Sequence, residues 1–257
     1  EQTSSQINHD VVFHLAALIS VPHSKSAARA YIDTNTSGTM NVLMGARRAQ
    51  RVVVTSTSEI YGTAREVPIT EAHSTHPQSP YAASKVGADA IAVSFLETYD
   101  IPATILRPFN TYGPRQSERA IIPTIIRQAI DSRCATIELG SLDAKRDLTY
   151  VTDTVAAFIA VADYDNPVCV GETYNCGAGK SITIGELAQH LAGDKKITLS
   201  EERTRVNEVW HLEAGCNKIF QDTGWEPEVA LIDGLAKTKK WWKQHLGSLK
   251  REASYVV

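Results

Sequence analysis

Short apolar runs alternate with longer amphipathic stretches along this chain. Runs rich in β-branched residues predict strands near residues 11–15, 51–56, 103–107, 135–139 and 172–175. The intervening stretches predict helices near residues 36–49, 82–99, 120–131, 152–163, 183–192 and 230–246. This alternation is typical of a parallel sheet covered by helices on both faces, so the predicted fold class is α/β.

The last predicted helix has one apolar face. Its apolar residues recur at helical spacing and predict a packed stripe: Leu231, Leu235, Trp242 and Leu246. Its lysines are expected on a solvated face: Lys237, Lys239, Lys240 and Lys243. This helix is therefore predicted to be structural.

The bulk composition excludes several classes of function. A net charge of −3 and a hydrophobic content of 43% are ordinary for a globular protein and give no sign of nucleic-acid or membrane binding. No apolar run approaches the ~18 residues that a membrane span needs. The four cysteines are scattered, which favours reduced thiols and a cytoplasmic protein. His73 and His76 lie in a polar loop without a further ligand nearby, so we predict no metal site.

Two polar motifs stand out against this background. Residues 55–62 read Thr-Ser-Thr-Ser-Glu-Ile-Tyr-Gly and follow an apolar run that is typical of a buried parallel strand. Tyr81 and Lys85 open a predicted helix and share one of its faces, because residues four apart are neighbours there. A nearby ammonium lowers the pKa of a phenol from its usual value of about 10. Tyr81 is therefore expected to act as a general base.

With these motifs the chain resembles the NAD-dependent epimerase/dehydratase family of extended short-chain dehydrogenases/reductases. The matching stretches run in family order: residues 12–17, 35–39, 55–62, 79–85, 107–115 and 146–153. The resemblance implies a Rossmann-like doubly wound parallel sheet, a smaller α/β substrate-binding domain and activity on nucleotide-activated sugars. It assigns residues 1–110 and 150–178 to the NAD-binding domain and residues 111–149 and 179–257 to the substrate-binding domain.

One feature of the family is missing from the sequence. The family opens with a strand, a Gly-x-x-Gly-x-x-Gly turn and a helix that hold the cofactor pyrophosphate, whereas no glycine here precedes Gly38. Residues 177–180 (Gly-Ala-Gly-Lys) are expected to form a plain strand-to-helix turn. The NAD-binding domain is therefore predicted to be incomplete. Either the chain is part of a longer protein, which we favour, or the protein lacks the loop and binds dinucleotide poorly.

The resemblance also implies roles for the residues of the motifs. Tyr81 would take the proton from the sugar 4-hydroxyl, Lys85 would steady the phenolate and Thr57 would orient the hydroxyl. Glu59 would remove the proton at the fifth carbon of a 4-keto sugar, and Ser58 stands where dTDP-glucose dehydratases carry the aspartate that protonates the leaving hydroxyl. Glu59 therefore disfavours simple epimerisation.

The remaining expected contacts involve the cofactor and the substrate. The implied NAD-binding residues are Ala16, Ala17, Thr55, Ser56, Tyr81, Lys85 and Pro108. The implied substrate-binding residues are Asn110, Arg115 and Arg146, with the two arginines clamping the diphosphate. Either arginine could instead form a structural ion pair with Asp147 or Asp153. Asn35 is expected to fasten its helix, and His14 to be a satisfied core histidine.

The sequence predicts a nucleotide-sugar 4,6-dehydratase that uses NAD and a UDP- or GDP-linked sugar. The alternatives are a nucleotide-sugar 4-epimerase, a UDP-glucuronate-type decarboxylase, or a non-catalytic module that has lost NAD binding. The apolar residues on more than one face of helices 36–49 and 82–99 are consistent with a homodimer through these helices, as the family implies.

Overall fold

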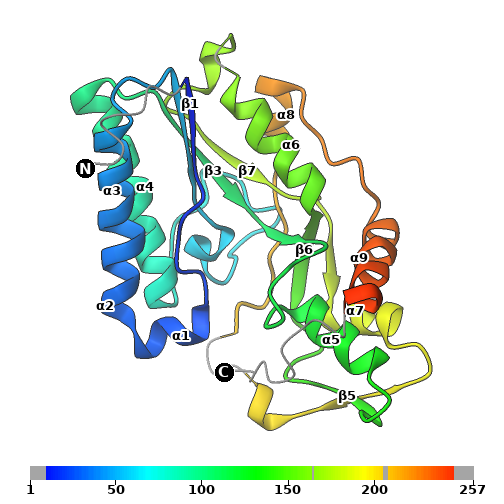
Figure 1. Cartoon of the computed structure of the whole chain (residues 1–257). Helices are drawn as coiled ribbons and strands as arrows, with labels where there is room; N and C mark the ends of the chain where they lie inside the picture. Colours follow the sequence, from blue (N-terminus) through cyan, green and yellow to red (C-terminus); the bar gives the residue numbers. More distant parts are fainter. Residues whose placement is uncertain (1–9, 164, 205–207, 246–257) are drawn as a thin grey trace.

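The computed structural model of the chain describes residues 10–163, 165–204 and 208–245. Within these residues, the main sheet has four parallel strands in the order β1-β2-β3-β7. The strands are β1 (Val11–His14), β2 (Arg51–Thr55), β3 (Ala103–Pro108) and β7 (Thr173–Cys176). Helices lie on both faces of this sheet, as the alternating pattern predicts (Figure 1).

The side chains of β2 explain this layering, because successive residues of a strand point to opposite faces. Val52 and Val54 pack in one cluster with helices α3 (Gly38–Gly45) and α4 (Pro80–Tyr99). Val53 packs in another cluster with α6 (Val151–Ala162) and α8 (Asn217–Thr223). All three valines are fully buried. A continuous apolar strand is the expected sequence of a sheet that is covered twice.

The helical segment before β2 begins earlier than predicted. It runs through α1 (Val21–Ser26), α2 (Ala28–Tyr31) and a π-helical segment, η1 (Ile32–Ser37), before α3. The predicted helix 36–49 therefore starts too late, and it also ends too late, because α3 stops at Gly45. The side-chain amide of Asn35 in η1 accepts a hydrogen bond from the Leu18 amide at 2.8 Å and donates to the Leu18 carbonyl at 2.9 Å. It also donates to Ser84 Oγ at 2.9 Å. It fastens its segment to the loop after β1 and to α4, as expected.

A second layer of structure stands beside the main sheet (Figure 1). Its strands are β4 (Asn110–Tyr112), β6 (Lys145–Tyr150) and β8 (Ser181–Thr183), with a separate parallel pair, β5 (Thr136–Leu139) and β9 (Lys196–Leu199). Its helices are α5 (Ile121–Ile130), α7 (Ile184–Ala192) and α9 (Leu231–His245). Its core includes Ile125, Leu187, Leu235 and Trp242. The packed stripe of α9 is thus confirmed for its described part, whereas Leu246 lies outside the described residues.

The segment around α8 crosses back to the main sheet. Ile219 and Trp225 share a cluster with the α6 side of the sheet, and the Trp225 indole donates to the carbonyl of Asp153 at 3.0 Å. The sequence places these residues in the substrate-binding domain, so the domain boundaries stay a prediction. The remaining helical turns are η2 (Ser58–Tyr61), η3 (Pro167–Cys169) and η4 (Glu201–Arg203). No helix in the described part of the chain is long and apolar enough to cross a membrane.

Candidate active site

The predicted cofactor residues gather at one edge of the main sheet. Ala16 and Ala17 follow the end of β1, Thr55 ends β2, and Pro108 ends β3. Thr55 is in register with Leu106 of the neighbouring strand, so the carboxyl ends of the strands are level. Ligands of open α/β sheets bind beyond this edge. The structure therefore brings these residues to the expected place.

The polar motif after β2 forms a short, capped turn. Thr57 precedes η2, and its Oγ1 accepts a hydrogen bond from the Glu59 amide at 3.3 Å. Ser56, Thr57 and Ser58 are buried, whereas Glu59 is half-buried. The turn therefore places these four residues one after another directly beyond the end of β2.

Tyr81 lies in the first turn of α4. Ser79 caps the helix by accepting from the Ala82 amide at 3.1 Å, and Pro80 occupies the first helical position. The Tyr81 ring stacks edge-on against Tyr31, with ring centroids 6.2 Å apart. Its phenol hydrogen-bonds Thr57, and the charge of Glu59 reaches it. Thus α4 and η2, which are distinct in sequence, meet at the phenol.

The electrostatics of this meeting point differ from the sequence prediction. The pKa of Tyr81 is raised to about 12, chiefly by burial, and Glu59, Tyr31 and Asp89 raise it further, while only the hydrogen bond to Thr57 lowers it. The Lys85 ammonium donates to the main-chain carbonyl of Thr55. The prediction that Lys85 lowers the pKa of Tyr81 is wrong for this structure, because burial dominates and the ammonium is engaged elsewhere.

Lys85 is itself nearly inaccessible. Burial lowers the pKa of its ammonium, and the nearby carboxylate of Asp89 raises it in part. The pKa of His14 is lowered to about 4, mainly by burial and further by the charge of Lys85. His14 lies 2.9 Å (Nε2 to Oγ1) from Thr39 and is the satisfied core histidine that the sequence predicts.

The predicted substrate residues occupy three different environments. The buried Asn110 Oδ1 has no hydrogen-bond partner among residues 10–163, 165–204 and 208–245. Arg115 is exposed and has a left-handed backbone, with φ of 65°. Arg146 is buried: its Nη1 donates to the carbonyl of Val209 at 2.6 Å, and its Nη2 pairs with Glu208.

The expected ion-pair partners of the arginines are not the observed ones. Asp147 accepts hydrogen bonds from the amides of Ala178, Gly179 and Ala214 at 2.6 to 3.0 Å. Asp153 accepts from the amide of Val229 at 3.0 Å. Neither carboxylate pairs with Arg146, whose partner is 62 residues away in the chain. The prediction of a structural pair with Asp147 or Asp153 is therefore wrong.

The amides that bind Asp147 also settle the nature of the glycine-containing turn. Residues 177–180 connect β7 to the short strand β8, and α7 begins only after β8. The predicted strand-to-helix turn is thus a strand-to-strand turn. A side chain at Gly177 would collide with the Ala214 side chain, so glycine is needed here for close packing. The turn is not a phosphate-binding loop, because its amides are used by Asp147.

Two charged residues at the site did not emerge from the sequence. Asp89 follows Lys85 by one helical turn, and Arg107 immediately precedes Pro108. Arg107 donates to Asp89 Oδ2 from Nε at 3.2 Å and from Nη2 at 3.1 Å. The four-residue spacing of Tyr81, Lys85 and Asp89 is the signal that could have indicated Asp89.

Comparison with known sequences points to one family. A family model described as GDP-mannose 4,6 dehydratase matches residues 1–238. The dTDP-D-glucose 4,6-dehydratase of Mus musculus is 31% identical over 251 residues, which cover 94% of this chain and 70% of the relative.

Comparison with solved structures gives the same result. The dTDP-glucose 4,6-dehydratase DesIV of Streptomyces venezuelae, solved with NAD bound, matches with a TM-score of 0.85 at 29% identity; the match covers 97% of this chain and 78% of that one. The UDP-N-acetylglucosamine 4-epimerase of Methanobrevibacter ruminantium matches with a TM-score of 0.86 at 28% identity, over 95% and 80% of the two chains.

Proposed function

We propose, on the premise that this chain belongs to the GDP-mannose 4,6-dehydratase family of extended short-chain dehydrogenases/reductases, that it is an NAD-dependent nucleotide-sugar 4,6-dehydratase. The observation that carries the proposal is the meeting of Tyr81, Thr57 and Glu59 at the carboxyl ends of the strands. Tyr81, held by Thr57, can exchange the proton of a sugar hydroxyl, and the Glu59 carboxylate beside it can remove a proton from carbon. Together they suit an oxidation followed by an elimination.

The residues around Tyr81 fit the nicotinamide end of NAD. The Thr55 Oγ1 is buried and has no hydrogen-bond partner among the described residues, so a polar group is accommodated there. The residues proposed to hold the cofactor are Ala16, Ala17, Thr55, Ser56, Tyr81, Lys85 and Pro108. When bound, NAD would accept the hydride from the fourth carbon of the sugar and, after water has left, would supply a hydride to the sixth carbon, while a proton returns to the fifth. The dehydratase from Streptomyces venezuelae was solved with this cofactor.

Tyr81 is proposed to move the proton of the sugar 4-hydroxyl. With a pKa of about 12 its phenol is protonated near neutral pH, so positive charge must approach before it can accept a proton. Lys85 can bring this charge if its ammonium releases the Thr55 carbonyl, because Lys85 lies one helical turn from Tyr81 on α4. Thr57 holds the phenol in place through its hydrogen bond.

Glu59 favours elimination from the 4-keto sugar over simple epimerisation. The ketone acidifies the neighbouring C–H bond at the fifth carbon, and Glu59 is proposed to remove that proton while the 6-hydroxyl leaves as water. Ser58 is buried, and a hydroxyl is a poor proton donor for the leaving group. Glu59 is therefore proposed to return its proton to the departing oxygen. An epimerase needs no such carboxylate.

The nucleotide diphosphate is proposed to bind Asn110, Arg115 and Arg146. Arg115 is exposed, whereas Arg146 is engaged by Glu208 and by two main-chain carbonyls. Arg146 must therefore share its guanidinium with Glu208 when it binds phosphate. The Streptomyces and Methanobrevibacter enzymes are named for dTDP- and UDP-linked sugars and support such a substrate, and the family model, described as GDP-mannose 4,6 dehydratase, supports a GDP-linked one.

Product analysis tests the proposal directly. The full chain, supplied with NAD, is incubated separately with UDP-, dTDP- and GDP-linked hexoses. A 4-keto-6-deoxy sugar with its alkaline absorbance is the expected product. Recovery of the 4-epimer alone would favour the epimerase, and release of carbon dioxide from a glucuronate substrate would favour the decarboxylase. A non-catalytic module predicts no rise of Tm with added NAD.

The homodimer is proposed to form through α3 and α4 with the adjoining η1. Three large apolar side chains there are partly exposed: Ile32 at 42%, Met40 at 39% and Val93 at 48%. Burying such a face against a second copy removes apolar surface from water. Light scattering should give a dimer mass for the native chain and a monomer mass for the double variant Met40→Glu and Val93→Glu. A dimer that survives both charges would place the interface elsewhere.

A further inference from the structure

A buried polar chain runs beneath the proposed active site and is not used in the chemistry. It starts at Asp89 of α4, passes to Arg107 of β3 and reaches Tyr61 of η2, whose hydroxyl accepts from Arg107 Nη1 at 2.9 Å. The Tyr61 hydroxyl in turn donates to Asn175 Oδ1 of β7 at 2.8 Å. Asn175 is anchored by Glu71, which accepts from its amide at 2.8 Å.

Two residues of this hydrogen-bonded chain, Asp89 and Tyr61, belong to the elements that carry the proposed catalytic groups. Asp89 lies on the same face of α4 as Tyr81 and Lys85, two helical turns after Tyr81 and one after Lys85. Tyr61 is the last residue of η2, the turn that holds Ser58 and Glu59 and is capped by Thr57. Arg107 of β3 thus contacts both elements, through Asp89 of α4 and Tyr61 of η2.

The environment of Arg107 makes this bridge specific. Its side chain is 12% exposed and that of Asp89 is 9% exposed, so water does not compete freely for the ion pair. The planar guanidinium also lies over the Tyr61 ring, 5.3 Å from its centroid. Three fixed contacts from one rigid fork restrict the distance between α4 and η2 more than separate hydrogen bonds to water could.

We infer that Arg107 is a positioning residue that, through Asp89 and Tyr61, sets the distance between the helix carrying Tyr81 and Lys85 and the turn carrying Thr57 and Glu59. The inference rests on the proposed function, because it assigns a role within the same site. Its consequence is that loss of the Tyr61 hydroxyl loosens η2 and slows turnover without removing any group that contacts the substrate.

The test compares two buried tyrosines that each lose one hydroxyl. Tyr61→Phe breaks the bridge. Tyr174→Phe is the matched control, because Tyr174 is also fully buried and its hydroxyl donates to Asp222 at 2.9 Å, away from the site. Hydrogen exchange of residues 57–62 and steady-state turnover of the full chain are measured for both variants and for the native protein.

We expect faster exchange of residues 57–62 and a kcat about tenfold lower in Tyr61→Phe, with KM within about twofold, because misplacement of reacting groups costs rate more than binding. Tyr174→Phe should match the native protein in both respects. A further variant, Arg107→Lys, keeps the charge beside Asp89 but loses the fork, and should reproduce the Tyr61→Phe pattern.

The two readouts separate the inference from its premise. Unchanged exchange of residues 57–62 in Tyr61→Phe would overturn the positioning role, whatever the activity. Equal losses of kcat in both tyrosine variants would overturn it too, because a general loss of packing would then explain them. Faster exchange confined to Tyr61→Phe, in a native protein that turns over no nucleotide sugar, would uphold the bridge and refute the proposed function.

Discussion

Lys85 and Lys239 occupy similar local settings in two different regions of the molecule. Each ammonium donates to a main-chain carbonyl, that of Thr55 for Lys85 and that of Leu191, at 3.0 Å, for Lys239. Burial is the main cause of a lowered pKa in both. Judged by the lysine alone, the two regions could not be told apart.

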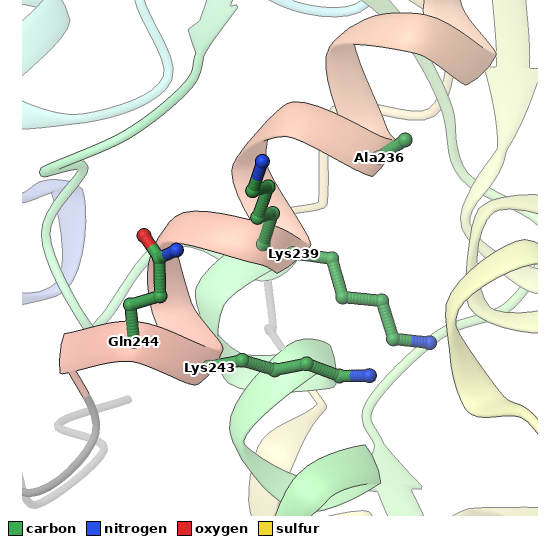
Figure 2. A pocket seen from close by; sticks show the side chains of 5 residues that line it. Ala236, Lys239, Lys243 and Gln244 are labelled. Carbon is green, nitrogen blue, oxygen red and sulfur yellow. The ribbon is translucent and has the colours of Figure 1, made fainter.

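The neighbours of the two lysines differ. Asp89 opposes the effect of burial on Lys85, whereas Lys243 adds to it on Lys239. Figure 2 shows a pocket on α9, which is lined by Ala236, Lys239, Lys240, Lys243 and Gln244. These lining residues include no carboxylate and no phenol. A hollow with a half-buried lysine is therefore insufficient for chemistry, which needs groups that can exchange a proton with one another.

The largest expected effect is at Tyr81. Tyr81→Phe removes the group that moves the 4-hydroxyl proton, and general acid–base catalysis is worth roughly 10²- to 10⁴-fold. We expect kcat to fall by about a thousandfold with the fold intact, as judged by circular dichroism. Tyr99→Phe, at a half-exposed tyrosine of the same helix, is the control and should retain full activity. A near-native kcat in Tyr81→Phe would contradict the proposed role of Tyr81 in proton transfer.

The two lysines can be compared directly by the same substitution. Lys85→Met should lower kcat by about a hundredfold, because the phenol loses the charge that makes it a base. Lys239→Met should leave kcat within about twofold and lower Tm slightly, since the Leu191 carbonyl loses its donor. Equal effects on kcat would contradict the distinction between the two regions.

Asp89 offers a pH test of the same region. The groups that shift the pKa of Tyr81 are Thr57 and Glu59 from the η2 segment, Tyr31 from α2 and Asp89 from α4, while the Lys85 ammonium donates to the Thr55 carbonyl. The Asp89 carboxylate raises the pKa of Tyr81, so its removal in Asp89→Asn lowers that pKa. The acidic limb of the kcat/KM profile should then shift to lower pH. A shift to higher pH would show that Asp89 acts in another way.

The smallest effect is expected on the face of α9. Lys243→Gln removes a charge beside Lys239 and should raise the pKa of the Lys239 ammonium slightly, because one repulsion is lost. Lys243 is exposed, and surface substitutions usually change stability by less than about 0.5 kcal/mol. Activity and Tm should match the native chain. A severalfold change of kcat would indicate that the pocket in Figure 2 belongs to the working site.

The sequence predicted the parts of the site that depend on local patterns. The run Val52 to Val54 indicated a doubly covered strand, and the polar residues after it then had to lie at the sheet edge. The spacing of Tyr81 and Lys85 placed them on one helix face. These features depend on a local apolar run, on the residues that directly follow it and on helix spacing, and the structure confirms their positions.

The sequence did not predict the features that depend on distant contacts. The partner of Arg146 is Glu208, and no spacing rule connects residues 62 positions apart. The pKa of Tyr81 depends mainly on the burial of its phenol in the folded chain, which the helix spacing does not reveal. β6 was missed because its run from Lys145 to Tyr150 is polar in sequence, although most of its residues are buried.

The most direct test of the account is a single turnover by Glu59→Gln. The variant keeps Tyr81, Thr57 and Lys85, so it should still oxidise the fourth carbon of a nucleotide hexose while elimination stalls. With NAD and substrate in the full chain, the absorbance of reduced nicotinamide should rise and persist, and 4-keto-6-deoxy sugar should not form. Native rates of product formation, or the absence of both reduced nicotinamide and product, would contradict the assignment of separate roles to Tyr81 and Glu59.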